Sequence, residues 1–510
     1  MEFTEFKNAV IAEAKALGLT DYELYYQSGS DLSVSAFQHE INEFSSSIDG
    51  GVCFRCLVNG KMGYASTQAL NADQAKSIVA HAMENAASLE AEEEEFLCPG
   101  GKTYAPLDRK PYALPSTEEL ISAVLDTQDK LYAADPSVID GTSARGLAQT
   151  MNIAICNSKG LDVSYESSVA GLIAMPTVSD GTEMENDFSA KLGKLDTIDA
   201  KALADKAVNR AKGNLGGEVP TTQACPVVFD PEAMSDLLQT FSDIFSSENA
   251  QKGLSRLAGQ EGQVIAAPCV TLVDDPFHKD NPMPINFDAE GCPTYKKNVI
   301  ENGVLTTLLY NMKTAAVAGK ETTGNAFKGS YTSPVGIEPF TMYLAGGDLT
   351  EEELLSKAGN GVYITSLGGL HAGANAITGD FSLQSAGFLI ENGKKTTHVK
   401  SFTVAGNFYQ LLKNITALAN NTQLPTPFGM TTFGAPSVLV DGLSIAGKKN
   451  RFQAHVRLPS WGRIFASPGK NGRMQCRSSR FFCRLSPAGL VYPGISHDWH
   501  ESIVTIFGEY

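Results

Sequence analysis

The sequence predicts an α+β protein, in which a helix-and-strand N-terminal region is followed by a β-rich, antiparallel, barrel-like C-terminal domain. Amphipathic helices and alternating strands share the part of the chain before residue 218, whereas hairpin signals dominate the part after residue 224. A chain of 510 residues is too long for one hydrophobic core, so we expect several domains. Hydrophobic residues make up 43% and charged residues 19%, as is typical of globular proteins.

Residues 1–95 are predicted to form an N-terminal α+β domain. The first helix should end at Gly18 and carries one apolar stripe, which consists of Phe3, Phe6, Val10, Ala14 and Leu17. Strands follow, and two of them should meet in a hairpin at Asn59-Gly60, the dipeptide best suited to a type I′ turn. A second helix is expected at about 72–89.

Residues 96–218 are predicted to be a middle α+β segment that packs with the first. Ser116 and Glu119 have the spacing of a capping box, which marks the start of a helix. A hairpin is expected within 151–176, and a helix should close the segment at about 199–213.

Residues 224–449 are predicted to be the β-rich C-terminal domain. Hairpins are expected at Asn302-Gly303, Asn392-Gly393 and Asp441-Gly442. A helix should begin after Asp230, with Pro231 in its first turn. Its buried face would consist of Met234, Leu237, Leu238, Phe241, Ile244 and Phe245.

Residues 450–510 differ from the rest of the chain and are predicted to be an anomalous basic tail outside the main fold. This segment holds both tryptophans and seven of the twelve arginines, and no hydrophobic period runs through it. A shifted reading frame or read-through would explain the change in composition. A basic tail that binds nucleic acid is the alternative.

The composition argues against several classes of protein. A net charge of −17 disfavours binding to nucleic acid or to an anionic membrane, because both need a positive surface. No apolar run is long enough to span a bilayer, and the N-terminus does not resemble a signal peptide. Nine scattered cysteines without an export signal predict reduced thiols and a cytoplasmic location.

Three histidine or cysteine motifs are candidates for chemical sites. Cys53 and Cys56 are three residues apart on a predicted strand, so they should face opposite sides and serve packing. The acidic loop around His278 could hold Ca²⁺ or Mg²⁺, although a solvated turn is favoured. His398 is expected at the surface. The zinc signature HExxH is absent from the sequence.

The loop at 366–387 is the most suggestive polar segment. It has five glycines but lacks the spacing of a phosphate-binding loop. Glycine-rich polar loops often line a site because a ligand can approach their backbone closely. The candidate substrate or partner residues are His371, Asn375, Thr378, Asp380 and Ser382. A plain connection between strands is the alternative.

Over residues 1–449 the chain resembles the TldD/PmbA family. The stretches that carry the resemblance are GLHAGANAITGDFSLQSAGFLIENGK, YNMKTAAVAGKETTGNA, AGNFYQLLKNI and GAPSVLVDGLSIAGK. The resemblance implies one of two kinds of subunit. The TldD kind is a zinc metallopeptidase with an HExxxH helix and a late cysteine ligand. The PmbA (TldE) kind lacks these ligands and pairs with the first.

Carried over to this sequence, the metal motif falls on the helix after Asp230. Gln239 and Ile244 take the two histidine positions, and Thr240 takes the glutamate position. Amide and aliphatic groups do not replace imidazole ligands, and threonine does not replace a carboxylate base. No cysteine lies between Cys292 and Cys476. We therefore expect a PmbA/TldE-like subunit with no catalytic residue and no metal of its own.

The resemblance implies that zinc is bound by a TldD-like metallopeptidase partner and that the pair degrades or trims unfolded peptides by proteolysis. A heterodimer is expected, and a homodimer is possible when the chain is isolated. Two alternatives stay open: an independently active hydrolase that uses the 366–387 loop, and a non-catalytic homodimer that binds peptides.

Overall fold

The computed structural model describes residues 1–90, 96–108, 110–426 and 431–448. The basic tail predicted at 450–510 lies outside these residues, so its interpretation stays a prediction. In the described part of the chain, no helix is both long and apolar enough to cross a bilayer.

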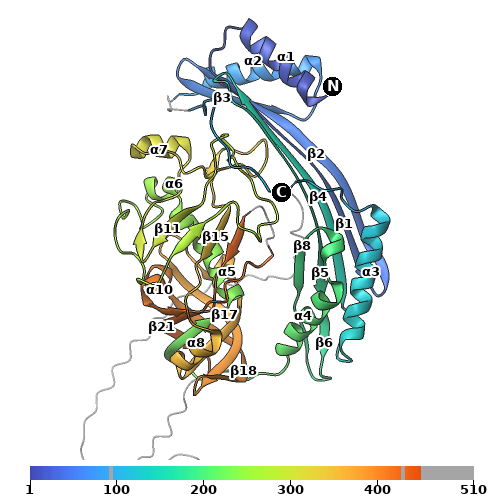
Figure 1. Cartoon of the computed structure of the whole chain (residues 1–510), viewed down its shortest axis with the longest axis vertical. Helices are drawn as coiled ribbons and strands as arrows, with labels where there is room; N and C mark the ends of the chain where they lie inside the picture. Colours follow the sequence, from blue (N-terminus) through green and yellow to red (C-terminus); the bar gives the residue numbers. More distant parts are fainter. Residues whose placement is uncertain (91–95, 109, 427–430, 449–510) are drawn as a thin grey trace, which may run out of the picture. The chain divides into compact units, whose positions relative to one another are not determined.

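A six-stranded antiparallel sheet forms the N-terminal half, with strand order β3-β2-β1-β4-β5-β8 (Figure 1). Its strands are β1 (Tyr22–Phe37), β2 (Glu40–Val58), β3 (Lys61–Thr67), β4 (Ser143–Asn157), β5 (Asp162–Met175) and β8 (Ser189–Gly193). A separate two-stranded ribbon is formed by β6 (Thr177–Ser179) and β7 (Met184–Asn186), which lie between β5 and β8 in the sequence. Strands from the segments 1–95 and 96–218 thus share one sheet.

Two pairs of helices cover the same face of this sheet at its opposite ends. They are α1 (Phe3–Ala16), α2 (Ala72–Ser88), α3 (Thr117–Ala134) and α4 (Ala200–Gly213), and the short η1 (Leu195–Thr197) precedes α4. Leu24 packs in the core under α1 and α2, and Val34 packs in the core under α3 and α4. Because even-numbered residues of β1 reach both cores, both helix pairs lie on one face.

The C-terminal half contains a mixed barrel, with antiparallel and parallel strand pairs in the order β18-β17-β16-β9-β21. The barrel is closed because its first strand, β18, also pairs with its last strand, β21. The predicted barrel-like domain is thereby confirmed. The barrel strands are β9 (Gln223–Phe229), β16 (Gly361–Gly368), β17 (Asp380–Glu391), β18 (Lys394–Asn407) and β21 (Val438–Ala446); β19 (Ile415–Leu418) extends the sheet from β21.

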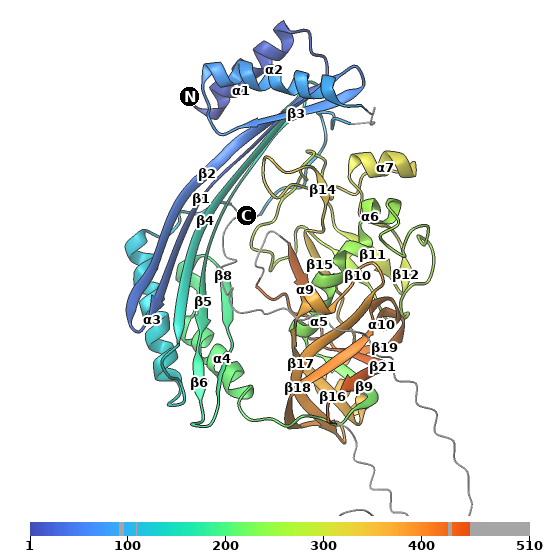
Figure 2. The same ribbon diagram turned by 180° about the vertical axis from the view of Figure 1, so that it is seen from behind.

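A second sheet of five strands, in the order β12-β11-β10-β15-β20, packs beside the barrel (Figure 2). Its strands are β10 (Leu272–Asp274), β11 (Lys297–Glu301), β12 (Val304–Leu305), β15 (Thr341–Leu344) and β20 (Thr432–Gly434); β13 (Ala326–Phe327) and β14 (Gly336–Ile337) pair separately. One hydrophobic core joins both sheets to α5, and it includes Phe229, Phe241 and Met342.

The helices of this half are short. They are α5 (Pro231–Phe241), η2 (Ser242–Phe245), α6 (Ser247–Gln251), α7 (Met312–Ala318), α8 (Glu351–Ala358), α9 (Leu370–Gly373) and α10 (Phe408–Asn414). α5 and η2 correspond to one predicted amphipathic helix. Its predicted apolar face is buried, but the α-helix ends at Phe241 and a 3₁₀ turn follows.

Local sequence signals fix most turns correctly. The asparagines of the three Asn-Gly pairs predicted to form hairpins adopt positive φ angles, as the type I′ turn requires, and each of these pairs joins two antiparallel strands. The predicted hairpin at Asp441-Gly442 is wrong. Both residues lie within β21, where Gly442 (φ 81°) marks an irregularity in the pairing with β9 between Val440 and Leu443.

Candidate functional site

The helix α5 carries the positions at which the family resemblance places a metal motif. The Asp230 carboxylate accepts a hydrogen bond from the Ala233 backbone N–H at 2.7 Å and so caps the helix, and Pro231 opens its first turn. Phe241 stacks on Phe408 of α10 with ring centroids 4.5 Å apart. The buried face therefore holds α5 firmly against the barrel.

The three degenerate motif positions do not come together as a ligand set. Gln239 is exposed on α5, whereas Ile244 lies in η2 with 1% of its surface exposed. The Thr240 hydroxyl donates to the Asp236 carbonyl at 2.7 Å, a bond within the helix. Residues 230–260 contain neither histidine nor cysteine, so this helix offers no imidazole or thiolate donor to zinc.

The loop at 366–387 spans the end of β16, the short helix α9 and the start of β17. α9 packs against α5, so the loop and the degenerate motif helix are neighbours. His371 lies on α9 and is exposed, as is Ser382 at the start of β17. The resemblance and the polar-loop argument therefore point to adjoining parts of one surface.

Several of the predicted loop residues stabilise the turn before β17. The Asn375 side-chain oxygen accepts hydrogen bonds from the Ile377 and Thr378 backbone N–H groups, each at 3.0 Å. The Asn407 amide donates to Asp380 at 2.8 Å, and this bond lowers the pKa of the Asp380 carboxyl. No hydrogen bond joins the side chains of His371, Asp380 and Ser382, all of which are described, so a nucleophile-base arrangement is not assembled.

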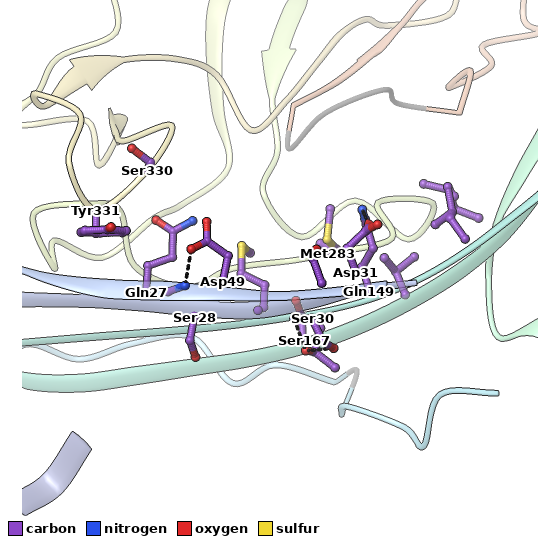
Figure 3. A pocket seen from close by; sticks show the side chains of 18 of the residues that line it. Gln27, Ser28, Ser30, Asp31, Asp49, Gln149, Ser167, Met283, Ser330 and Tyr331 are labelled. Carbon is purple, nitrogen blue, oxygen red and sulfur yellow. Dashed lines mark hydrogen bonds between the residues drawn. The ribbon is translucent and has the colours of Figure 1, made fainter. Parts of the chain in front are cut away.

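A cleft of about 600 Å³ lies against the face of the long sheet opposite to the helices. The strands β1, β2, β4, β5 and β8 supply one wall, and residues of the C-terminal half supply the other. Figure 3 shows Gln27 and Asp49 projecting from the strands on the side on which Ser330 and Tyr331 lie. The volume is in the range usual for ligand pockets.

Two contacts define how the C-terminal half bounds this cleft. Tyr331 lies so close to Gly51 of β2 that a Cβ atom at Gly51 would be 2.5 Å from the tyrosine ring. The Thr426 hydroxyl donates to the Ala190 carbonyl of β8 at 2.8 Å. Tight packing at Gly51 and a hydrogen bond at β8 thus join the two walls.

One polar atom of the cleft lacks a partner. The side-chain oxygen of Gln27 is buried, and no hydrogen bond reaches it from any described residue. An unsatisfied buried acceptor is costly, and a ligand N–H group would satisfy it once the Gln27 side chain turned its oxygen toward the cleft. Gln27 is therefore the strongest candidate for a ligand contact on the sheet wall.

A buried charged group lies where the first sheet meets the C-terminal half. Arg55 pairs with Glu23 at 2.8 Å, and both side chains are almost completely buried. Nearby, burial raises the pKa of Glu290 to about 8 and that of Asp288 to about 6. The raised values follow from the loss of hydration around the charged carboxylates.

Asp288, Glu290 and Cys292 lie close enough together to be considered as metal ligands, with donor atoms within 4.8 Å of one another. Both Asp288 oxygens are already used by the backbone N–H groups of Glu290, Cys292 and Ala326. One Glu290 oxygen accepts from the Met312 N–H at 2.8 Å. These carboxylates therefore have a structural explanation, and we assign them no metal.

The remaining cysteine and histidine motifs lie in packed or partly buried parts of the structure. Cys53 and Cys56 face different cores, as predicted from strand alternation. The solvated turn predicted around His278 is wrong for Asp274, which is completely buried and pairs with Lys297 at 3.1 Å. His398 is half-buried rather than superficial, because Gly217 packs against its ring.

Sequence reasoning missed the sheet wall of the cleft. Its residues share one face of alternating strands, but the sequence does not state which face the C-terminal half will cover. The available signal was the run of polar residues and glycine from Gln27 to Asp31, which contains no apolar side chain to pack against a core.

Together, the sheet, the barrel and the cleft define an α+β chain whose motif helix carries neither histidine nor cysteine. The chain belongs to the PmbA/TldD family. Residues 22–86 match PmbA/TldA metallopeptidase domain 1, residues 110–215 match the central domain, and residues 222–447 match the C-terminal domain.

Named relatives fall on both sides of this family. The chain is 26% identical to a metalloprotease PmbA homolog of Haemophilus influenzae, over 82% of this chain and 90% of that protein. It is 23% identical to a metalloprotease TldD homolog of the same organism, over 84% of this chain and 93% of that protein. The chain is thus similar to relatives of both kinds over most of its length.

Solved structures agree with the described fold. A Thermotoga maritima protein described as a candidate modulator of DNA gyrase is 30% identical, with a TM-score of 0.79, over 87% of this chain and all of that chain. TldE from Thermococcus kodakarensis is 24% identical, with a TM-score of 0.77, over 86% of this chain and 99% of that chain. The second likeness concerns the fold alone.

Proposed function

We propose that this chain is a PmbA/TldE-like subunit that binds no zinc itself and takes part in peptide hydrolysis with a TldD-like, zinc-bearing partner. The observation that carries the proposal is the donor set of α5 and η2. An exposed amide at Gln239, a hydroxyl at Thr240 and a buried aliphatic chain at Ile244 stand where the family's zinc motif is expected. A heterodimer in the cytoplasm is part of the same proposal.

The chemistry that zinc supplies in such a pair is activation of a water molecule for attack on the peptide carbonyl. In this chain, Thr240 has no carboxylate to take a proton from that water, and its hydroxyl is bonded to Asp236. Under this proposal, the catalytic centre belongs to the partner.

The contribution proposed for this chain is to hold an extended, unfolded peptide. The cleft presents Gln27, Asp31, Asp49 and Gln149 along neighbouring strands, where the Gln149 amide donates to the Asp31 carboxylate, and these polar groups could exchange such bonds for bonds to a peptide backbone. The free side-chain oxygen of Gln27 is an acceptor for a peptide N–H. Leu147, Val169 and Leu192 add apolar surface for side chains.

The alternative of an independently active hydrolase rests on His371, Asp380 and Ser382. His371 and Ser382 are exposed, and Asp380 is engaged by Asn407 rather than by His371. A nucleophile needs a base within hydrogen-bonding reach, so this geometry supports the alternative poorly. The loop suits contact with a substrate or with a partner better, since it adjoins α5.

The test uses the full chain alone, a TldD-like subunit alone and the two together. Each sample is assayed on an unstructured peptide while bound zinc is measured by mass spectrometry. We expect no zinc and no hydrolysis with this chain alone, and hydrolysis with zinc when both subunits are present. Stoichiometric zinc together with hydrolysis by this chain alone would reject the proposal.

The same samples separate the remaining alternatives. His371→Ala should abolish hydrolysis only if the chain is active by itself through the loop. Stable self-association with no gain of activity on adding the partner would instead favour a peptide-binding homodimer. Light scattering of the isolated chain and of the mixture distinguishes these two assemblies.

A further inference from the structure

Two cysteines that are 194 positions apart in the sequence meet at the junction between the first sheet and the C-terminal half. The Sγ atoms of Cys98 and Cys292 lie 3.2 Å apart. Cys98 is completely buried, and 3% of the Cys292 surface is exposed. A disulfide needs an S–S distance of about 2 Å, so the two sulfur atoms would approach by roughly 1 Å.

The backbone on both sides of this pair is held in place. The Asn157 side chain donates to the Cys98 carbonyl at 2.8 Å, and the Tyr104 hydroxyl donates to the Gly291 carbonyl at 2.8 Å. The Asn286 side chain donates to the Ala105 carbonyl at 2.7 Å. The segment before α3 is therefore bonded to the loop that carries Cys292, and the thiols are held close together.

The pair borders a cavity, but Cys98 has no exposed surface and Cys292 only 3%, so a small molecule reaches the sulfur atoms when the wall of the cavity moves slightly. Both cysteines line a cavity of about 220 Å³, together with Lys102, Lys320 and other residues. The cavity is large enough for water or hydrogen peroxide, whereas the burial of both thiols excludes bulky reagents. The cavity thus selects small oxidants over large ones.

The two thiols are not chemically equivalent. The Cys292 S–H donates to the Cys98 sulfur, and this hydrogen bond lowers the pKa of Cys98, while the same bond and burial raise the pKa of Cys292. The thiolate is the nucleophilic form of cysteine, so Cys98 is the reactive member. Cys292 is placed to attack an oxidised Cys98.

Seven cysteines lie in the described part of the chain, and this pair differs from the others. Cys53, Cys56 and Cys156 are buried with pKa values raised by burial, as inert packing cysteines are. Cys269 is exposed, which makes it a matched control for unselective oxidation. No sulfur–sulfur hydrogen bond other than that between Cys98 and Cys292 is found among these seven.

We propose that Cys98 and Cys292 form a disulfide in response to hydrogen peroxide or a similarly small peroxide. The Cys98 thiolate attacks one peroxide oxygen, the O–O bond breaks, and a sulfenic acid and hydroxide form; the hydroxide takes up a proton to become water. Cys292 then attacks the Cys98 sulfur, the S–O bond breaks, and a second water leaves as the S–S bond forms. Two thiols are oxidised, and one peroxide is reduced to two waters.

The bond would fasten the segment before α3, which Asn157 of β4 holds against the first sheet, to the loop of the C-terminal half that carries Cys292. Cys98 and Cys292 belong to the same hydrophobic cluster as Tyr25 of β1 and as Tyr331, which lines the cleft. The crosslink encloses a long loop of the chain and so restricts the unfolded state strongly. Oxidation therefore reduces opening of the cleft at the Tyr331 end and raises thermal stability.

The test treats the folded full chain with graded hydrogen peroxide, blocks remaining thiols with a maleimide after denaturation, and maps the peptides without reduction. We expect a linked pair of peptides containing Cys98 and Cys292 that has lost two hydrogen atoms, and its return to free thiols with dithiothreitol. The melting temperature should rise by roughly 5 °C on oxidation of the wild type. Cys98→Ser and Cys292→Ser should abolish both effects, and Cys269→Ser should abolish neither.

Two results would overturn the proposal. One is that Cys98 and Cys292 remain free thiols at a peroxide concentration that oxidises Cys269. The other is a stoichiometric metal ion that is lost in both Cys98→Ser and Cys292→Ser, because the pair would then be a ligand set. If either serine variant fails to fold, the peptide map of the wild type still decides the question.

Discussion

Restoring the three residues of the zinc motif should destabilise this chain rather than convert it into an active metallopeptidase. The variant is Gln239→His, Thr240→Glu and Ile244→His, made together. Gln239 is exposed at the end of α5, but Ile244 lies in the 3₁₀ turn with 1% of its surface exposed. The fold places the two new imidazoles in different environments.

The cost arises almost entirely at Ile244. Removing a buried isoleucine side chain costs about 2–5 kcal/mol of unfolding free energy. A buried imidazole without a partner adds roughly 1–3 kcal/mol. Because the replacement fills part of the volume, we expect a total loss of about 3–6 kcal/mol, a large share of the stability of a typical domain.

The assay is urea unfolding of the wild type, the triple variant and each single variant, with zinc measured in the same samples. Gln239→His serves as the matched control, because substitution at an exposed position changes stability by only about 0.5 kcal/mol. Ile244→His alone should account for most of the loss. Added zinc should not raise the unfolding midpoint of the triple variant.

A different outcome would refute the reasoning. If the triple variant binds one zinc, gains stability on binding it and cleaves an unstructured peptide alone, then the fold itself supports a catalytic centre on α5. In that case only the identity of the three side chains, and not the buried position of residue 244, would prevent the wild-type chain from binding zinc.

Three further predictions follow from the cleft and the buried acids. Gln27→Ala should weaken binding of an unstructured peptide by up to about tenfold in fluorescence titration, the value of one hydrogen bond, while Ser28→Ala should not; equal affinity for all three proteins would exclude Gln27 as a contact. Gly51→Ala should displace Tyr331, because the new Cβ would lie 2.5 Å from its ring, and should lower the melting temperature; an unchanged melting temperature and crystal structure would contradict the tight contact. Glu290 has a pKa of about 8 in the folded chain, so the folded state keeps a proton that the unfolded state releases above about pH 4.5. Stability should therefore fall as the pH rises from about 4.5 to 8, by up to roughly 1 kcal/mol per pH unit from this group, and Glu290→Gln should reduce that slope in urea unfolding; identical slopes would show that Glu290 titrates normally.

The sequence predicts elements whose determinants are local. The Asn59-Gly60 turn needs two positive φ angles, and the Ser116–Glu119 capping box needs only neighbouring residues, so both could be recognised from spacing. Asp441-Gly442 carried a similar local signal but failed, because β21 pairs on both sides and its glycine is absorbed as an irregularity within the strand. The residues of a strand do not by themselves specify which other strands it will pair with.

The site was predictable to a smaller extent for the same reason. The missing donors on α5 follow from the residues alone, whereas the burial of Ile244 depends on the barrel and the second sheet that enclose it. Gln27 faces the cleft only because the C-terminal half covers that face of β1. Cys98 and Cys292 are 194 positions apart, and no spacing rule connects them.

The candidate site has two parts, the motif helix α5 and the polar cleft, and peptide binding and bond cleavage place different physical demands on them. The motif helix contributes its apolar face to the core, and Ile244 at a ligand position adds to that packing. A buried imidazole at residue 244 would need a hydrogen-bond partner or a metal ion to satisfy it, so a chain that keeps aliphatic packing at this residue gains stability without metal. The polar cleft does not share this constraint, since its wall is built by the first sheet. Under the proposed function, a subunit of this kind can therefore retain peptide binding while its partner alone retains the metal.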